Sequence, residues 1–149
     1  MSVPTTLILA LIAVESGGND HAWGDNGKAW GCLQITAAVM EDVQRISPQD
    51  RYYNAFVRDD AIWICRTYLN HYVTRSRIGH EPTLADYARC WNGGPKGHLK
   101  IETRPYWLKV KAALQTISSG ASPVGGTMKP SRPSAKSGHL RPQPATQRG

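Results

Sequence analysis

The stretch that most constrains the fold is LILALIAVESGG, Leu7 to Gly18, in which eight apolar residues lead into a glutamate, a serine and two glycines. A helix that is apolar on all sides must be buried, and this one is too short to span a bilayer. Glycine readily adopts the left-handed conformation that ends many helices, so Gly17 and Gly18 predict a C-terminal stop. We therefore expect a buried helix that places Glu15 at the edge of the core.

A carboxyl group at the edge of an apolar core is partly desolvated, which raises its pKa and favours the protonated form. Protonated carboxyl groups are what general acid catalysis requires. Glu15 is therefore a candidate general acid. The alternative is a solvated carboxylate at a helix end, which is the usual situation of a glutamate.

The same apolar run has the length of the core of a secretory signal peptide. Met1 to Thr6 contains no Lys or Arg, however, and no clear small-x-small cleavage site follows the run. We expect no signal peptide and no membrane-spanning helix, and the export route stays open. The missing signal and the few cysteines favour a bacterial or phage source.

The composition changes abruptly near Ser118. We expect a folded domain over residues 1–118 and a basic tail over residues 119–149 that is rich in Pro, Gly and Ser. The tail has too little apolar surface to offset its ordering entropy, which predicts disorder. It carries five of the net +7 charges, on Lys129, Arg132, Lys136, Arg141 and Arg148. Such a tail can contact anionic wall polymers or stay solvated without a specific partner.

The remaining charge and the cysteines exclude several classes of protein. The folded part retains a net charge of about +2, which gives no support for a specific nucleic-acid partner. Cys32, Cys65 and Cys90 are too few and odd in number for a disulfide framework, so either one bridge or free buried thiols is expected. The chain has no CxxC pair and its histidines are scattered, so we expect no metal and no cofactor. We expect a monomer.

The rest of the domain predicts helices and one small hairpin. Asn26-Gly27 is typical of a two-residue hairpin turn, which places a hairpin at about Ala22 to Ile35. Apolar spacing and capping residues predict the following helices: one capped by Thr36 through about Ile46, a central one from Ala55 to about Arg77, one from the Thr83 and Asp86 capping box to Gly93, and one from Pro105 to about Ser118.

Asp25 in this hairpin is a candidate second carboxylate. Cleavage of a polysaccharide needs an acid to protonate the leaving oxygen and usually a second carboxylate across the bond. A hydrated turn would keep Asp25 ionised while the helix end keeps Glu15 protonated. The alternative is an ordinary turn residue whose side chain caps its own backbone.

Four short motifs make the chemistry more specific. ESGGN followed by GCLQI resembles the motifs of the lysozyme-like superfamily, which includes soluble lytic transglycosylases and goose-type lysozymes. CWNGGP is similar to a later transglycosylase motif, Ala-Tyr-Asn-Ala-Gly-Pro. ARCWNGGPKG and TRPYWLKV, within Ala88 to Val110, are similar to motifs of invertebrate-type (destabilase) lysozymes. The resemblance covers about Leu7 to Lys111 and leaves out the tail.

The resemblance implies a mainly α, lysozyme-like fold and cleavage of the β-1,4 bond between MurNAc and GlcNAc in peptidoglycan, at the cell wall or outside the cell. Glu15 matches the general acid, and Asp25 matches the second carboxylate if the turn is shifted by about one residue. The substrate-groove positions carried over are Gln34, Asn92, Gly93 and Tyr106. Trp91 replaces the family's His or Tyr, so it either stacks on a sugar or fills the core.

Three functions remain open at this point. The first is a muramidase that hydrolyses the glycan with Glu15 and Asp25. The second is a lytic transglycosylase, in which Glu15 acts as acid and base and the sugar's own 6-hydroxyl attacks, which leaves an anhydro end. The third is a non-catalytic glycan-binding module, which would leave the cost of burying Glu15 without a purpose.

Overall fold

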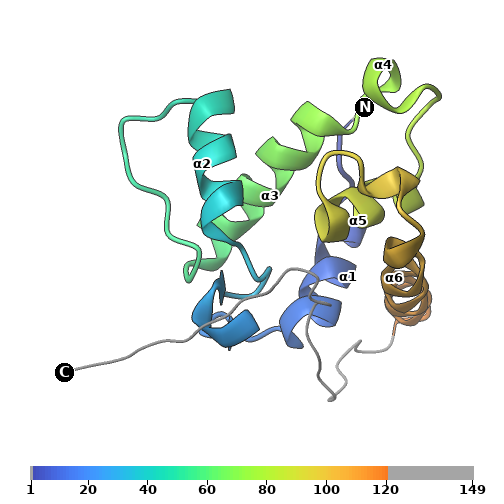
Figure 1. The fold of residues 1–149 in the computed structure, drawn as a ribbon. Coiled ribbons are helices and arrows are strands. Elements are labelled where there is room, and N and C mark those ends of the chain that lie inside the picture. Colours follow the sequence, from blue (N-terminus) through green and yellow to red (C-terminus); the bar gives the residue numbers. More distant parts are fainter. Residues whose placement is uncertain (1, 121–149) are drawn as a thin grey trace.

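The computed structural model describes residues 2–120, so the predicted disordered tail lies outside the described residues from Ala121 onward. The fold is mainly helical with one two-stranded antiparallel sheet, as the sequence predicts (Figure 1). The elements follow in the order α1 (Thr5–Ser16), β1 (Trp23–Gly24), a 3-10 turn (Asp25–Gly27), β2 (Ala29–Trp30), α2 (Ala37–Ile46), α3 (Arg58–Tyr72), α4 (Arg75–Ile78), α5 (Leu84–Gly93), two further 3-10 turns (Gly97–Leu99 and Ile101–Thr103) and α6 (Arg104–Ser118).

Helix α1 is the buried apolar helix predicted from the sequence. It packs against α5 and α6, which lie beside it in Figure 1. Its buried residues are Leu7, Ile8, Ala10, Leu11 and Ile12. The helix ends at Gly17, which has a φ of 64° and donates its N–H to the carbonyl of Ala13. This end confirms the predicted stop and leaves Glu15 in the last turn. Within residues 2–120, none of the helices is long and apolar enough to cross a membrane.

The prediction of one helix from Ala55 to Arg77 is wrong at both ends. Residues 55 and 56 form a turn before Arg58, closed by the N–H of Val57 donating to the carbonyl of Asn54 at 3.0 Å. The Asp60 carboxylate holds this turn by accepting from the N–H of Asn54 at 2.9 Å and from Arg51 at 2.6 Å. Beyond Tyr72 the helix stops. Thr74 then starts the separate helix α4 by accepting a hydrogen bond from the N–H of Arg77. The turn held by Asp60 and the cap formed by Thr74 override the continuous apolar spacing.

The other three predicted helices are confirmed. Thr36 caps α2 by accepting from the N–H of Val39, and Thr83 with Asp86 forms a complete capping box at the start of α5. Pro105 lies in the first turn of α6, where its missing N–H has no helical partner to lose.

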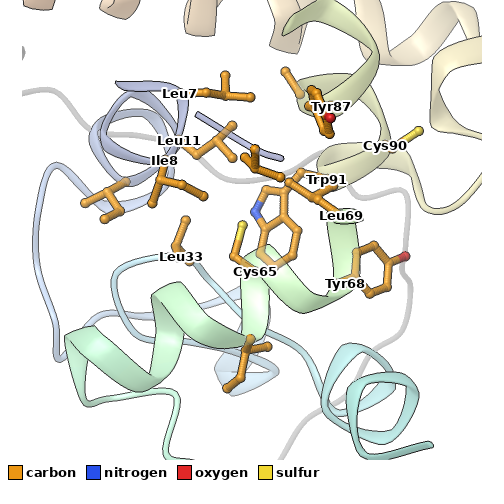
Figure 2. Packing of buried hydrophobic residues seen from close by; sticks show 14 of the residues in the cluster. Leu7, Ile8, Leu11, Leu33, Cys65, Tyr68, Leu69, Tyr87, Cys90 and Trp91 are labelled. Atoms are coloured by element: carbon orange, nitrogen blue, oxygen red, sulfur yellow. The ribbon is translucent and has the colours of Figure 1, made fainter. Parts of the chain in front are cut away.

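The core lies where α1, α3 and α5 meet, and Figure 2 shows part of it. Leu7 and Leu11 from α1 face Leu69 from α3, and Leu33 enters from the segment after the hairpin. All three cysteines are buried and free, so the free-thiol alternative is confirmed and the single bridge is not formed.

The thiols should be inert in the folded protein. Burial raises the pKa of Cys32 to about 12 and the pKa of Cys65 well above its usual value. Only the thiolate reacts with a disulfide reagent, and at pH 8 a pKa of about 12 leaves about one Cys32 in ten thousand as thiolate. We expect a colorimetric disulfide reagent to label the native protein very slowly and to label three thiols per chain at once in guanidinium. Rapid labelling of any thiol in the folded state would contradict this packing.

Candidate active site

Glu15 lies half-buried on the last turn of α1, and a hydrogen bond orients its side chain. The hydroxyl of Tyr106 donates to Glu15 Oε2 at 2.7 Å. Tyr106 is 9% exposed and lies in the first turn of α6, so the two residues are joined by helices that pack along each other. The structure therefore brings together two of the predicted site residues that are far apart in the sequence.

Glu15 lies near one buried side chain of the core. Cys65 of α3 is fully buried, and after burial the next cause that raises the pKa of its thiol is the Glu15 carboxylate. An electrostatic effect of this kind falls off with distance, so the carboxylate lies near the buried thiol. Glu15 is thus half-buried and hydrogen-bonded to Tyr106, as expected for a carboxyl group at the edge of a core.

The residue after Glu15 fixes the end of α1 to the segment that follows the hairpin. Ser16 Oγ donates to the carbonyl of Cys32 at 2.8 Å and accepts from the N–H groups of Gly18 and Asn19 at 3.2 and 3.1 Å. A hydroxyl can donate one hydrogen bond and accept two, and Ser16 Oγ does both in these three contacts. The ESGGN and GCLQI motifs are therefore one structural unit.

Arg58 at the start of α3 holds the loop after Ser16, and the sequence analysis missed it. Its Nε donates to Asp20 Oδ1 at 2.9 Å, and its Nη2 donates to the carbonyl of Gly18 at 2.6 Å. Arg58 is 38 positions from Asp20 and 40 positions from Gly18 in the chain, and no local pattern in a single sequence indicates such contacts.

Asp25 lies at the tip of the predicted hairpin, half-buried, in a loop that differs from the prediction. Trp23 pairs with Trp30 and Gly24 with Ala29, so the loop contains the four residues 25–28 instead of an Asn-Gly pair. Asp25 and Asn26 have φ values of 53° and 57°, which is the left-handed region. Non-glycine residues there cost about 1 kcal/mol or more each and are frequent at functional sites.

Gln34 is brought against this hairpin, but it is buried. It is 8% exposed, has a φ of 54°, and donates from Nε2 to the carbonyl of Gly31 at 3.1 Å. Its Oε1 lies so close to Gly24 that a Cβ added there would be only 1.9 Å away. Gln34 thus shapes the strand that leads into Asp25.

Asn92 and Gly93 form the end of α5. The buried Nδ2 of Asn92 has no hydrogen-bond partner among residues 2–120. A buried donor left unpaired costs roughly 1–3 kcal/mol. Gly93 accepts at its carbonyl from Lys100 Nζ at 2.7 Å, and a Cβ there would lie 2.5 Å from Thr103 Cγ2. The contact with Thr103 explains why position 93 has no side chain.

Trp91 does not offer a face to a sugar, which corrects one predicted site residue. It is 5% exposed and forms an edge-on aromatic contact with Tyr68. Figure 2 shows its indole in the midst of the core side chains. The side chain of Trp91 therefore fills the core. The core alternative stated for Trp91 is the correct one.

Comparison with known proteins gives three similarities. The transglycosylase SLT domain matches residues 1–113. The lysozyme of Ostrea edulis is 39% identical over 67 residues, which are 45% of this chain and 44% of that protein, so the chain spans less than half of this relative. A chain in the crystal structure of Aeromonas hydrophila PliI in complex with Meretrix lusoria lysozyme superposes with a TM-score of 0.63 and 26% identity, over 74% of this chain and 89% of that one.

Proposed function

The chain belongs to the transglycosylase SLT domain family, and from this premise we propose that it cleaves the β-1,4 bond between MurNAc and GlcNAc in peptidoglycan. The comparisons match a transglycosylase domain and a lysozyme, and these are the two groups that the sequence motifs resemble. The proposal places its action at the cell wall or outside the cell, on glycan strands, without a cofactor. It assigns the activity to residues 1–118 and gives the basic segment 119–149 an auxiliary role on anionic wall polymers.

The observation that carries the proposal is the half-buried Glu15 carboxyl group held by the hydroxyl of Tyr106 at 2.7 Å. In this role Glu15 gives its proton to the glycosidic oxygen as the bond to the sugar breaks. The Tyr106 hydroxyl fixes the orientation of the carboxyl group, and the rigid end of α1 fixes its position. Fixed orientation lowers the entropy cost of reaching the transition state.

We assign Asp25 the second carboxylate role, in which its negative charge stabilises the oxocarbenium ion that forms when the leaving oxygen departs. Its place in a strained left-handed loop supports this assignment, because the hairpin holds Asp25 in a conformation that few non-glycine residues adopt. Gln34 and Gly24 shape that hairpin. Asn92 lies half-buried at the end of α5, where we place it beside the glycan, and Gly93 lets this end of α5 pack closely on Thr103.

A lytic transglycosylase is the second candidate, and the family match over residues 1–113 favours it. That reaction uses Glu15 first as acid and then as base for the sugar's own hydroxyl, so it needs no second carboxylate. The two candidates therefore differ in what Asp25 does.

Asp25→Asn should separate them. Under the hydrolase proposal the substitution removes the charge that faces the forming cation, and we expect a fall in the rate of glycan cleavage on the order of 10²- to 10³-fold. The measurement is the release of soluble fragments from purified peptidoglycan at matched protein concentration. Asp50→Asn, which changes an exposed aspartate in the segment between α2 and α3, is the matched control. Nearly full activity of Asp25→Asn would favour the transglycosylase.

A further inference from the structure

Trp23 is a large exposed aromatic residue beside Asp25. It belongs to β1, pairs across the sheet with Trp30, and is 66% exposed. Only Gly24 separates it from Asp25 in the chain. A tryptophan with most of its surface in water contributes little to the core, and tryptophan is enriched at contact surfaces.

The ring of Trp23 is held in place from the side of the protein. The ring of Phe56 packs against it with a centroid distance of 5.2 Å and an interplanar angle of 37°. Gly27 in the hairpin loop also lies against it, since a Cβ at that position would be 3.7 Å from Cε3 of the indole. The backbone of Phe56 is held in place, because its N–H donates to Asn54 Oδ1 at 2.8 Å. A side chain that is already ordered loses little rotamer entropy when it binds a ligand.

Trp23 and Phe56 come from segments that the backbone joins tightly. A Cβ added to Gly31 would lie 1.9 Å from the carbonyl oxygen of Ala55, and Gly31 donates its N–H to the carbonyl of Ala22, directly before Trp23. The hairpin and the segment that leads into α3 are therefore in close contact, and this contact places Trp23 and Phe56 side by side.

We propose that Trp23, supported by Phe56, is a stacking platform that binds a sugar ring of the glycan strand next to Asp25. The inference rests on the proposed function for the identity of the ligand. One face of a pyranose ring carries polarised C–H groups and is apolar, so it stacks on the electron-rich face of an indole. Trp23 thereby fills the sugar-stacking role for which Trp91 is too deeply buried.

The test is glycan binding in chains that do not turn over. Calorimetric titration of the full chain carrying Glu15→Gln with soluble MurNAc-GlcNAc oligosaccharides gives the reference Kd. We expect Trp23→Ala and Trp23→Leu in this background to weaken binding about tenfold, as truncation of a stacking residue does. Trp23→Tyr keeps an aromatic face and should stay within about twofold of the reference. Tyr52→Ala, which removes a 78% exposed aromatic from another segment, is the matched control and should also stay within about twofold.

The leucine and tyrosine variants separate stacking from packing. Leucine preserves an apolar contact with Phe56 but has no aromatic face. Affinity restored by leucine, an unchanged Kd in Trp23→Ala, or no oligosaccharide binding by the Glu15→Gln chain would each overturn the platform. In the active chain the same loss should appear in KM, with kcat within about twofold. Binding that depends on Trp23 in a protein that releases no fragments would refute the proposed cleavage and leave the platform standing.

Discussion

Replacing Glu15 with Gln should lower the rate of fragment release from peptidoglycan by about 10²- to 10⁴-fold, because the leaving oxygen then departs without a proton from the enzyme. Glutamine has nearly the shape of glutamate and keeps an oxygen that accepts from the hydroxyl of Tyr106, which lies 2.7 Å from Glu15 Oε2 in the native chain. The substitution therefore removes the acid and preserves the contact. Glycan binding should survive in this variant.

The control for this result is Glu41→Gln, which makes the same chemical change on an exposed residue of α2. Its activity should equal that of the native protein, and both variants should melt within a few degrees of it. If Glu15→Gln retained more than about a tenth of the native rate, Glu15 would not be the proton donor. An equal loss in both variants would point to a general effect of removing a negative charge.

Gly31→Ala should cost about 3–5 kcal/mol of the free energy of unfolding, which is a large part of the stability of a domain of this size. Two costs add at this position. The backbone has a φ of 78°, which a residue with a Cβ rarely adopts, and the new Cβ would lie 1.9 Å from the carbonyl oxygen of Ala55. A backbone atom cannot swing aside as a flexible side chain can, so the hairpin must separate from the segment before α3.

Gly79→Ala isolates the first of these costs. Gly79 has a φ of 97° at the end of α4, but a Cβ there would meet nothing within 4 Å. We expect it to cost about 1–2 kcal/mol, the conformational term alone. Urea unfolding monitored by circular dichroism gives both values. Equal losses for the two alanine variants would show that the contact between Gly31 and Ala55 does not constrain the fold.

Patterns that act over a few residues predicted their parts of the fold well. The apolar run ending in Gly17 gave the position of Glu15, and the capping residues Thr36 and Thr83 gave the starts of α2 and α5. Each of these depends on local geometry and local hydrogen bonds. Glu15 and Tyr106 are 91 positions apart. Both could be named as site residues because they stand in family motifs, but no pattern in the sequence predicted the hydrogen bond between them.

The errors arose where two local signals competed or where packing against a distant residue decided the outcome. The apolar spacing continues past Tyr72, yet Thr74 caps a new helix. Periodicity alone therefore predicted one helix where the structure has two, α3 and α4. The Asn26-Gly27 pair favours a two-residue turn, but the register between Trp23 and Trp30 requires four loop residues. Trp91 has the chemistry of a sugar-binding residue, and only packing against Tyr68 shows that it is interior.

The hairpin therefore carries more of the candidate site than its sequence indicates. Asp25 is held in it by left-handed backbone, and the burial of Gln34 against Gly24 supports the strand before it. On the other side, α6 brings Tyr106 to Glu15. The candidate site thus combines two carboxyl groups from different elements: Glu15 on helix α1 and Asp25 in the left-handed hairpin loop.

Mass spectrometry of the fragments that the native protein releases from purified peptidoglycan distinguishes the reactions, because the chemistry of the new sugar end records which one occurred. Hydrolysis by Glu15 should give fragments with reducing MurNAc ends, each carrying the mass of one added water, and these fragments should be lost in Glu15→Gln. Fragments with anhydro ends would contradict hydrolysis and assign the reaction to Glu15 alone, and the absence of any fragment would contradict cleavage itself.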